Sequence, residues 1–174
     1  LTTSLSPVID LDRKSVLAIS NRLNNVDSSS DVYPTSDYVS SELAEGDQNA
    51  AIYLTKQVTL ENLATSLKVI LAAHRPSTND IKVMYKVLGA DESVDFESLG
   101  FRYFNDDGSA DTTVQPSADI NDFQDYLYTA GVTDDGIGTP LQEFISFQIK
   151  IIMQGTNTST PPRIKDLRIL ALAT

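Results

Sequence analysis

Four stretches of this chain carry an apolar side chain at every second position: 67–73, 81–88, 147–154 and 167–171. We predict strands over Leu67–Ala73, Ile81–Leu88, Leu141–Gln154 and Leu167–Ala171. Successive side chains of a β-strand point to opposite faces of a sheet, so this period, with many β-branched and aromatic residues, is typical of strands. In the second and third stretches one face is apolar and the other carries lysines, as expected when one face of a sheet lies on a core. The alternation therefore predicts an all-β protein with antiparallel strands.

The apolar faces of these stretches also predict the core. We expect one core that contains Val69, Leu71, Val83, Tyr85, Phe147, Ile149, Ile151 and Ile169. A further strand is predicted between Ala51 and Leu60. The turn residues of 75–80 predict a hairpin loop, and the Thr- and Pro-rich segment 155–162 predicts an exposed connection. Strands in such close succession leave little room for crossover helices, which favours an antiparallel β-sandwich, with a jelly roll as one form of it.

The front of the chain differs in composition from the rest. Residues 1–48 are predicted to form an N-terminal arm, followed by a β-sandwich domain of residues 49–174. Within the arm, residues 12–23 fit either a short helix or an extended segment. Residues 24–48 contain few aliphatic side chains and can bury little surface of their own. One more helical turn is predicted at residues 119–128.

Composition excludes several classes of site. The 174 residues include no Cys, which excludes disulfides, thiolate zinc sites and cysteine nucleophiles, and one histidine, His74, which excludes any site that needs two imidazoles. The 13 Lys and Arg against 24 Asp and Glu give a net charge of -11, whereas a nucleic-acid binder should carry a basic surface. Nucleic acid is therefore not expected as a partner. No signal-peptide pattern is present, and no apolar run approaches the roughly 20 residues of a membrane span, so a membrane is not expected as a partner either.

The acidic middle of the chain invites a test for a calcium site. Asn105, Asp107 and Asp111 surround Gly108, within a stretch whose residues 105–108 predict a turn. The calcium-loop pattern needs Gly at the sixth position and Glu at the twelfth, and the chain has neither there when counted from Asn105. A looser cage of oxygen ligands is the alternative, and a solvated acidic loop is the favoured interpretation.

Carboxylate pairs could cleave glycosidic bonds, since such enzymes place two carboxyls about the bond. The candidates are Glu92, Asp95 or Glu97 together with Asp122 or Asp125. Aromatic platforms for sugars could come from tyrosines outside the best strands, although a tyrosine also suits the edge of a core. These tyrosines are Tyr33, Tyr38, Tyr103, Tyr126 and Tyr128.

Two further features could form a site: the one histidine and a group of basic residues. His74 has no G-x-S-x-G nucleophile motif to accompany it, so we expect a structural or solvent-facing residue. The basic residues Lys82, Lys86, Lys150, Lys165 and Arg168 could form a stripe that meets the acidic arm or a neighbouring subunit. A solvated outer face is the favoured interpretation of that stripe. The sequence thus predicts no catalytic residue, no cofactor-binding residue and no metal ligand.

Two segments carry a resemblance to a known family. The segment 58–88, VTLENLATSLKVILAAHRPSTNDIKVMYKVL, and the segment 147–172, FQIKIIMQGTNTSTPPRIKDLRILAL, resemble virion structural proteins of contractile-tailed bacteriophages, particularly those of marine cyanobacteria. The family-like features are Tyr53-x-Thr55-Lys56-x-Val58-x-Leu60, then a Pro-containing loop and Asp80 to Leu88. The similarity covers roughly residues 49–174 and includes no catalytic residue.

The resemblance implies a structural domain of a baseplate or tail, assembled in the host cytoplasm and located in the virion. Its partners would be other virion proteins or further copies of itself, and it would be no enzyme. Two alternatives remain open. One is a carbohydrate-binding module, used for host adsorption or attached to an enzyme, which should show two or three exposed Tyr or Phe on a concave face. The other is a glycoside-cleaving enzyme, which should hold two carboxyls in one cleft.

Overall fold

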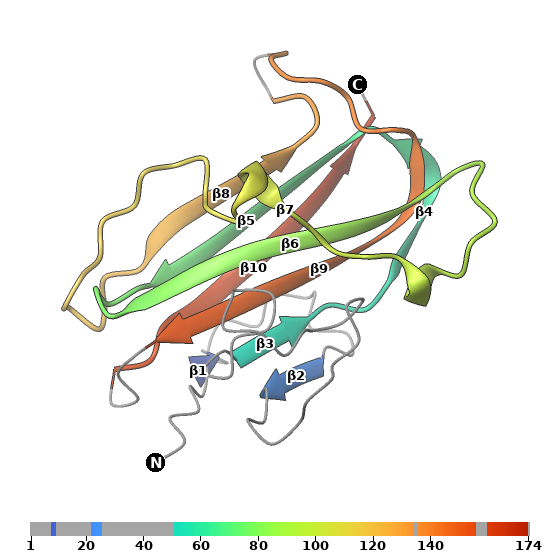
Figure 1. Ribbon diagram of the computed structural model, residues 1–174. Coiled ribbons are helices and arrows are strands. Elements are labelled where there is room, and N and C mark those ends of the chain that lie inside the picture. Colours follow the sequence, from blue (N-terminus) through green and yellow to red (C-terminus); the bar gives the residue numbers. More distant parts are fainter. Residues whose placement is uncertain (1–7, 10–21, 26–50, 134–135, 156–159, 174) are drawn as a thin grey trace.

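The computed structural model of the chain describes residues 8–9, 22–25, 51–133, 136–155 and 160–173. Its strands form two sheets (Figure 1). Sheet A has the strand order β1 (Val8–Ile9), β10 (Arg163–Leu172), β5 (Ser66–His74) and β8 (Gln124–Ala130). Sheet B has the order β2 (Arg22–Asn25), β3 (Ala51–Leu54), β9 (Phe144–Gly155), β6 (Asn79–Gly89) and β7 (Arg102–Tyr103), and β4 (Val58–Ala64) also pairs with β9.

The pairing is antiparallel throughout the described residues except between β1 and β10, which are parallel. Two single-turn 3₁₀ helices, η1 (Phe96–Ser98) and η2 (Phe104–Asp106), lie between β6 and β8. In the part of the chain that the structure describes, no helix has the length and apolar character to cross a membrane. The predicted all-β, antiparallel fold is therefore confirmed.

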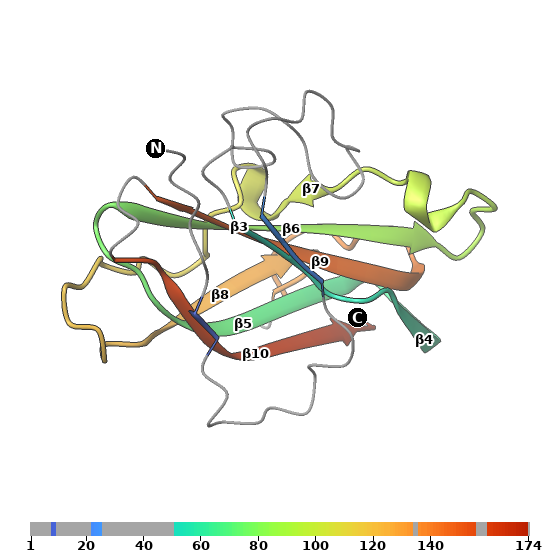
Figure 2. The same ribbon diagram turned by 90° about the horizontal axis from the view of Figure 1, so that it is seen from below.

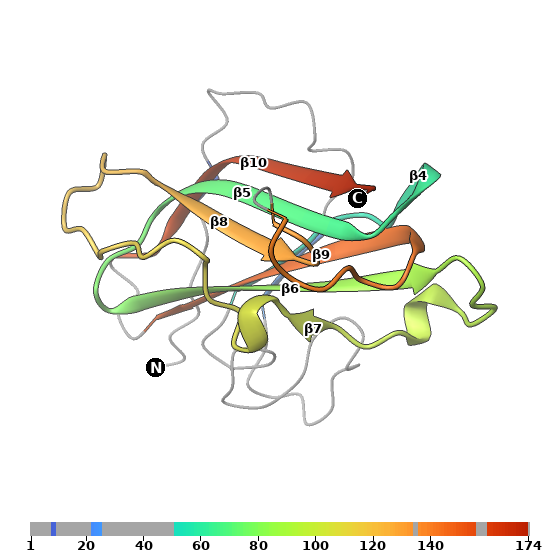
Figure 3. The same cartoon turned by 90° about the horizontal axis from the view of Figure 1, so that it is seen from above.

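The two sheets share one hydrophobic core. β5, β8 and β10 lie in one layer, and β6 and β9 lie in another (Figures 2 and 3). All eight residues predicted for the core belong to a single cluster between these layers, with seven of them buried and Ile169 packed against them as a partly buried member. The prediction of the core is confirmed because the period of two determines which side chains of a strand can point inward.

Successive long strands alternate between the sheets: β5 lies in sheet A, β6 in sheet B, β8 in sheet A, β9 in sheet B and β10 in sheet A. The predicted hairpin loop at residues 75–80 is therefore wrong, because β5 and β6 do not pair with each other. The same Pro, Asn and Asp residues that suit a hairpin also suit a loop that crosses from one sheet to the other.

Three predicted elements need correction. The helical turn at residues 119–128 is wrong, since residues 124–130 form β8, in which Tyr126, Tyr128 and Ala130 alternate inward. The strand predicted over residues 51–60 divides into β3 and β4. At the break, the Thr55 N–H donates to the Ile149 carbonyl at 3.0 Å and Thr55 Oγ1 accepts from the Ile149 N–H at 3.0 Å. The strand predicted from Leu141 begins at Phe144 instead.

Six residues of the predicted arm form strands with the rest of the chain. β1 extends sheet A beside β10, and β2 extends sheet B beside β3. Arg22 and Leu23, the end of the helix considered for residues 12–23, are thus in a strand, while residues 12–21 lie outside the described residues. The arm prediction did not include this pairing at the edges of both sheets.

Candidate functional site

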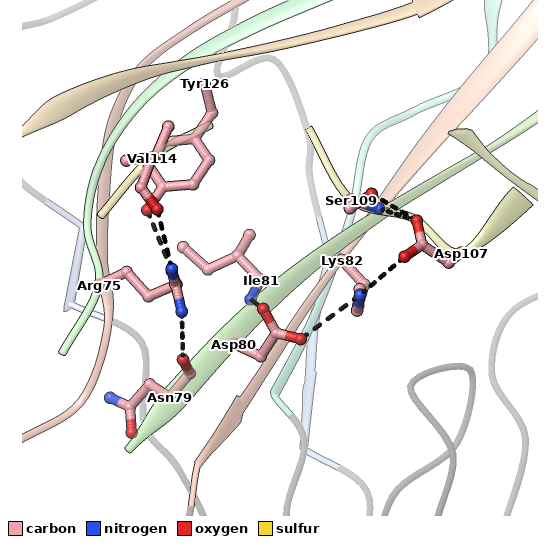
Figure 4. A network of polar contacts seen from close by, with 9 residues as sticks. All are labelled: Arg75, Asn79, Asp80, Ile81, Lys82, Asp107, Ser109, Val114 and Tyr126. Carbon is pink, nitrogen blue, oxygen red and sulfur yellow. Dashed lines mark hydrogen bonds and ion pairs between the residues drawn. The ribbon is translucent and has the colours of Figure 1, made fainter. Parts of the chain in front are cut away.

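The loop that crosses from β5 to β6 is anchored by Arg75. Its guanidinium donates from Nε to Tyr126 Oη at 3.3 Å, from Nη1 to the Asn79 carbonyl at 3.2 Å and from Nη2 to the Val114 carbonyl at 3.1 Å (Figure 4). Charge-assisted hydrogen bonds of this kind are among the stronger ones in proteins. One side chain therefore ties both sheets and the segment before β8 together at this end of the molecule.

A chain of charges continues along β6 from this loop. Lys82 Nζ lies 3.5 Å from Asp80 and 3.7 Å from Asp107 (Figure 4). Asp107 also accepts hydrogen bonds from the Ser109 hydroxyl and from the Ser109 N–H, the latter at 2.8 Å. These bonds from Ser109 are the main reason that the pKa of the exposed Asp107 carboxyl is lowered. Asp107 is thus oriented by its own loop and by Lys82.

The acidic loop considered for calcium has the predicted turn. Asn105, Asp106 and Gly108 adopt positive φ values of 51°, 62° and 76°. The Asn105 side chain donates from Nδ2 to Asp111 Oδ1 at 2.6 Å and to the Ser109 carbonyl at 2.9 Å. Among the described residues, no three His, Asp or Glu side chains gather in a way that could hold a metal ion. The polar groups of this loop bond to one another.

His74 is buried at the end of β5 and lies opposite Arg163 of β10. Its Nε2 donates to the Ser117 carbonyl at 3.0 Å, because a carbonyl oxygen can only accept. Its Nδ1 is buried and has no hydrogen-bond partner. His74 was expected to be either structural or solvent-facing. The structure confirms the structural role, and the solvent-facing alternative is wrong.

A pocket of about 480 Å³ lies beside His74, at the end where the chain crosses between the sheets. Its walls come from the loop after β5, from residues 116–120 and from the start of β10. Three segments distant in sequence contribute, and the sequence alone contained no signal for their convergence. Among the described residues, Arg163 is the one arginine in the lining, and its side chain forms no hydrogen bond or ion pair there.

The carboxylates considered for glycoside cleavage do not come together. Glu92, Asp95 and Glu97 follow the C-terminal end of β6, whereas Asp122 and Asp125 lie at the start of β8, near the N-terminal end of β6 (Figure 1). β6 has 11 residues, which corresponds to about 35 Å at the rise of a strand. Each acidic residue of the first group has a local role. Glu92 accepts from the Gly89 N–H, Asp95 caps η1, and Glu97 lies 3.7 Å from Lys86 Nζ.

The tyrosines considered as sugar platforms are largely internal. Tyr126 and Tyr128 are buried in the main core, and Tyr103 is partly buried. Tyr33 and Tyr38 lie outside the described residues. None of the aromatic side chains within the described burial pattern is exposed. Burial of the tyrosines follows from the inward alternation of β8, which the sequence analysis missed.

The five residues of the predicted basic stripe divide between the sheets. Lys82, Lys86 and Lys150 belong to sheet B, and Lys165 and Arg168 belong to sheet A. The prediction that these residues lie on a solvated outer face is confirmed for Arg168, which is exposed. It is wrong for Lys86 and Lys150, whose exposed fractions are 1 % and 0 %.

Aromatic rings cover the two buried lysines on the outer face of sheet B. Lys86 Nζ lies 4.5 Å from the Phe96 ring centroid and 5.1 Å from that of Phe101. Lys150 Nζ lies 4.7 Å from the Phe101 centroid. A cation over the face of an aromatic ring is attracted by the ring quadrupole. Phe96 and Phe101 come from the segment between β6 and β7.

The same outer face carries a second hydrophobic cluster, formed by Ile52, Leu54, Met84 and Ile152, with Phe101 and Tyr103 packed against it. Sheet B is therefore buried on both faces.

Comparison of the chain with protein-family models, with curated proteins and with solved structures finds no match.

Proposed function

We propose that the chain is a structural domain of a tailed-phage virion, in the baseplate or tail, and that it acts through protein–protein contacts rather than catalysis. Its partners are other virion proteins or further copies of the same chain. We also propose that the two sheets form a β-sandwich of the jelly-roll kind, because successive long strands alternate between the sheets.

The observation that carries this proposal is the place of β1 and β2. Both belong to the acidic front segment, and each adds a strand to an edge, one on sheet A and one on sheet B. Backbone pairing at a sheet edge depends little on which chain supplies the strand, so the same contact can form between neighbouring copies. A front segment that reaches both sheets is suited to linking subunits.

The rigidity of the domain agrees with this role. Sheet B has apolar clusters on both faces, and an antiparallel sheet that stands alone commonly leaves one face to water. The chain has no Cys, so its core does not depend on oxidation state. A domain of this kind can fold in a reducing host cytoplasm and then assemble.

The two alternatives receive less support. A sugar platform of exposed Tyr or Phe has no candidate among the described aromatic side chains. The carboxylates proposed for glycoside cleavage lie near opposite ends of β6.

The test is to find the chain in purified phage particles. Tryptic digestion should release the peptide of residues 151–163, which follows Lys150 and ends at Arg163. We expect this peptide in banded particles at a constant ratio to known tail proteins, and electron microscopy with a labelled antibody should place it on the tail or baseplate. A matched preparation from uninfected cells is the control. A peptide found only in the unassembled fraction of the lysate would contradict the proposal.

A further inference from the structure

The pocket beside His74 has the features of a ligand site. Its volume of about 480 Å³ lies within the range of about 300–1,000 Å³ that is usual for small-molecule sites. It is formed by described residues of three separate segments. Arg75 donates to the carbonyls of Asn79 and Val114, and Asn79 Nδ2 donates to the Thr160 carbonyl at 2.5 Å. Hydrogen bonds within the chain thus connect the walls of the pocket.

The charge in the pocket comes from Arg163. Its side chain is half-buried and makes no hydrogen bond or ion pair with any of the described residues. The nearby Asp122 interacts electrostatically with His74, but its carboxylate accepts a hydrogen bond from Gln124 at 3.0 Å. A guanidinium without a partner, in a chain of net charge -11, leaves a planar set of donors that matches a carboxylate.

Most of the other residues in the lining are serines, threonines and prolines. Four residues of the lining carry hydroxyl groups: Ser77, Thr78, Ser117 and Thr160. The Thr78 hydroxyl donates to Asn79 Oδ1 at 3.2 Å and the Ser117 hydroxyl accepts from the Asp119 N–H at 3.2 Å. The apolar lining includes the rings of Pro76, Pro116 and Pro161 and the side chain of Ile120. Such small saturated surfaces suit the C–H faces of a saturated ring, whereas hydroxyls suit a ligand that carries hydroxyls itself.

We infer that this pocket binds a hydroxylated ring that carries a carboxylate, that is, an acidic sugar residue of the uronic-acid class. Arg163 binds the carboxylate, and the hydroxyls of Ser77 and Thr160 bind the sugar hydroxyls. His74 belongs to the lining and holds Ser117 in place through its hydrogen bond to the Ser117 carbonyl. This inference concerns a binding site and does not depend on the assembly role proposed above.

The experiment titrates the full 174-residue chain with glucuronate and follows backbone amide resonances by NMR. Glucose, which lacks the carboxylate, and acetate, which lacks the ring, are the two ligand controls. We expect glucuronate to shift the resonances of Ser77, Ser117 and Thr160 and to bind at least about tenfold more tightly than either control, because a charge-assisted bond and the ring contacts both contribute. Equal binding of glucose or acetate, or no shift at these residues, would overturn the inference.

Two arginine variants on the same strand complete the test. Arg163→Gln should weaken glucuronate binding about tenfold or more, whereas Arg168→Gln, an exposed arginine that is absent from the pocket lining, should leave it unchanged. An equal loss in both variants would indicate attraction to general surface charge and would overturn the assignment. If Arg163→Gln fails to fold, the shifts in the unmodified chain decide the question alone.

Discussion

Phe104 packs edge-on against Tyr128, with the two ring centroids 5.9 Å apart. The centroid of the Phe104 ring also lies 4.8 Å from that of the Tyr85 ring. Tyr85 belongs to β6 of sheet B and Tyr128 to β8 of sheet A, so a residue of the η2 turn bridges the two sheets. Offset and edge-on contacts of this kind stabilise a core beyond the area they bury.

The Tyr128 hydroxyl is buried in this aromatic contact and has no hydrogen-bond partner. We expect Tyr128→Phe to leave the free energy of unfolding unchanged or raise it by about 1 kcal/mol, because a buried unsatisfied polar group is costly. Tyr126→Phe is the matched control, since the Tyr126 hydroxyl accepts from Arg75, and it should lose about 1 kcal/mol. Urea denaturation measures both. A larger loss for Tyr128→Phe than for Tyr126→Phe would contradict this account.

Stability should fall at alkaline pH. Burial raises the pKa of Tyr128, Tyr85 and Tyr126 above the model-compound value of 10.0. Below pH 10 these tyrosines are protonated in both the folded and the unfolded chain; above it the unfolded chain loses protons that the folded chain retains. The free energy of unfolding should therefore decrease as the pH rises above about 10. Absorbance at 295 nm should show these tyrosines ionising together with the loss of circular dichroism. If these tyrosines ionise while the circular dichroism still shows a folded chain, the prediction is wrong.

A charge in the main core should be severely destabilising. Ile149 is 0 % exposed in the centre of β9, and Ile149→Asp should lower the free energy of unfolding by about 3–5 kcal/mol, because it buries a carboxylate without a partner. Ile137 is 70 % exposed, so Ile137→Asp is the control and should change stability by less than about 0.5 kcal/mol. Chemical denaturation of the two variants compares them directly. Similar losses at both positions would refute the proposed core.

No enzymatic activity should depend on His74. It is the one imidazole of the chain, and its Nε2 is engaged with a backbone carbonyl, whereas a general base needs a hydrogen-bonded nucleophile. A panel of hydrolase substrates should give the same result for the unmodified chain and for His74→Gln. The prediction fails if a hydrolytic activity disappears in a variant whose circular dichroism shows an intact fold.

Deletion of residues 1–45 should separate folding from assembly. Residues 24–48 contain six larger apolar side chains, at about 1.5–3 kcal/mol each when buried, against about 1–2 kcal/mol of backbone entropy for every residue ordered. The described members of the main core lie between Tyr53 and Ala171. We therefore expect the truncated chain to unfold cooperatively as a monomer and to lose self-association or incorporation into particles.

Thermal denaturation and sedimentation of the full-length and truncated chains measure the two effects. A truncated monomer that loses its thermal stability would show that the front segment belongs to the fold itself. A truncated chain that still self-associates would show that β1 and β2 are not the linking strands.

Local patterns predicted more of this protein than its composition did. The inward positions of β5, β6 and β9 follow from the alternation of residues such as Val69, Val83 and Ile149. β8 was not predicted from the sequence because its two faces differ little in hydrophobicity. The apolar Leu127 lies on its outer side, whereas Tyr126 and Tyr128, which carry hydroxyls, lie on its inner side. The candidate site was not predictable in the same way, since Ser117 and Arg163 lie far from His74 in the sequence.

The sequence by itself determined the long strands β5, β6, β9 and β10 and which of their side chains face inward, because both depend on a period of two that neighbouring residues set. Only the tertiary structure decided which strands pair, that the loop after His74 crosses between sheets, and that Lys86 and Lys150 are buried beneath Phe96 and Phe101. The physical reason is that a turn sequence such as residues 75–80 is compatible with either connection. The choice between them lies in the packing of strands that are distant along the chain.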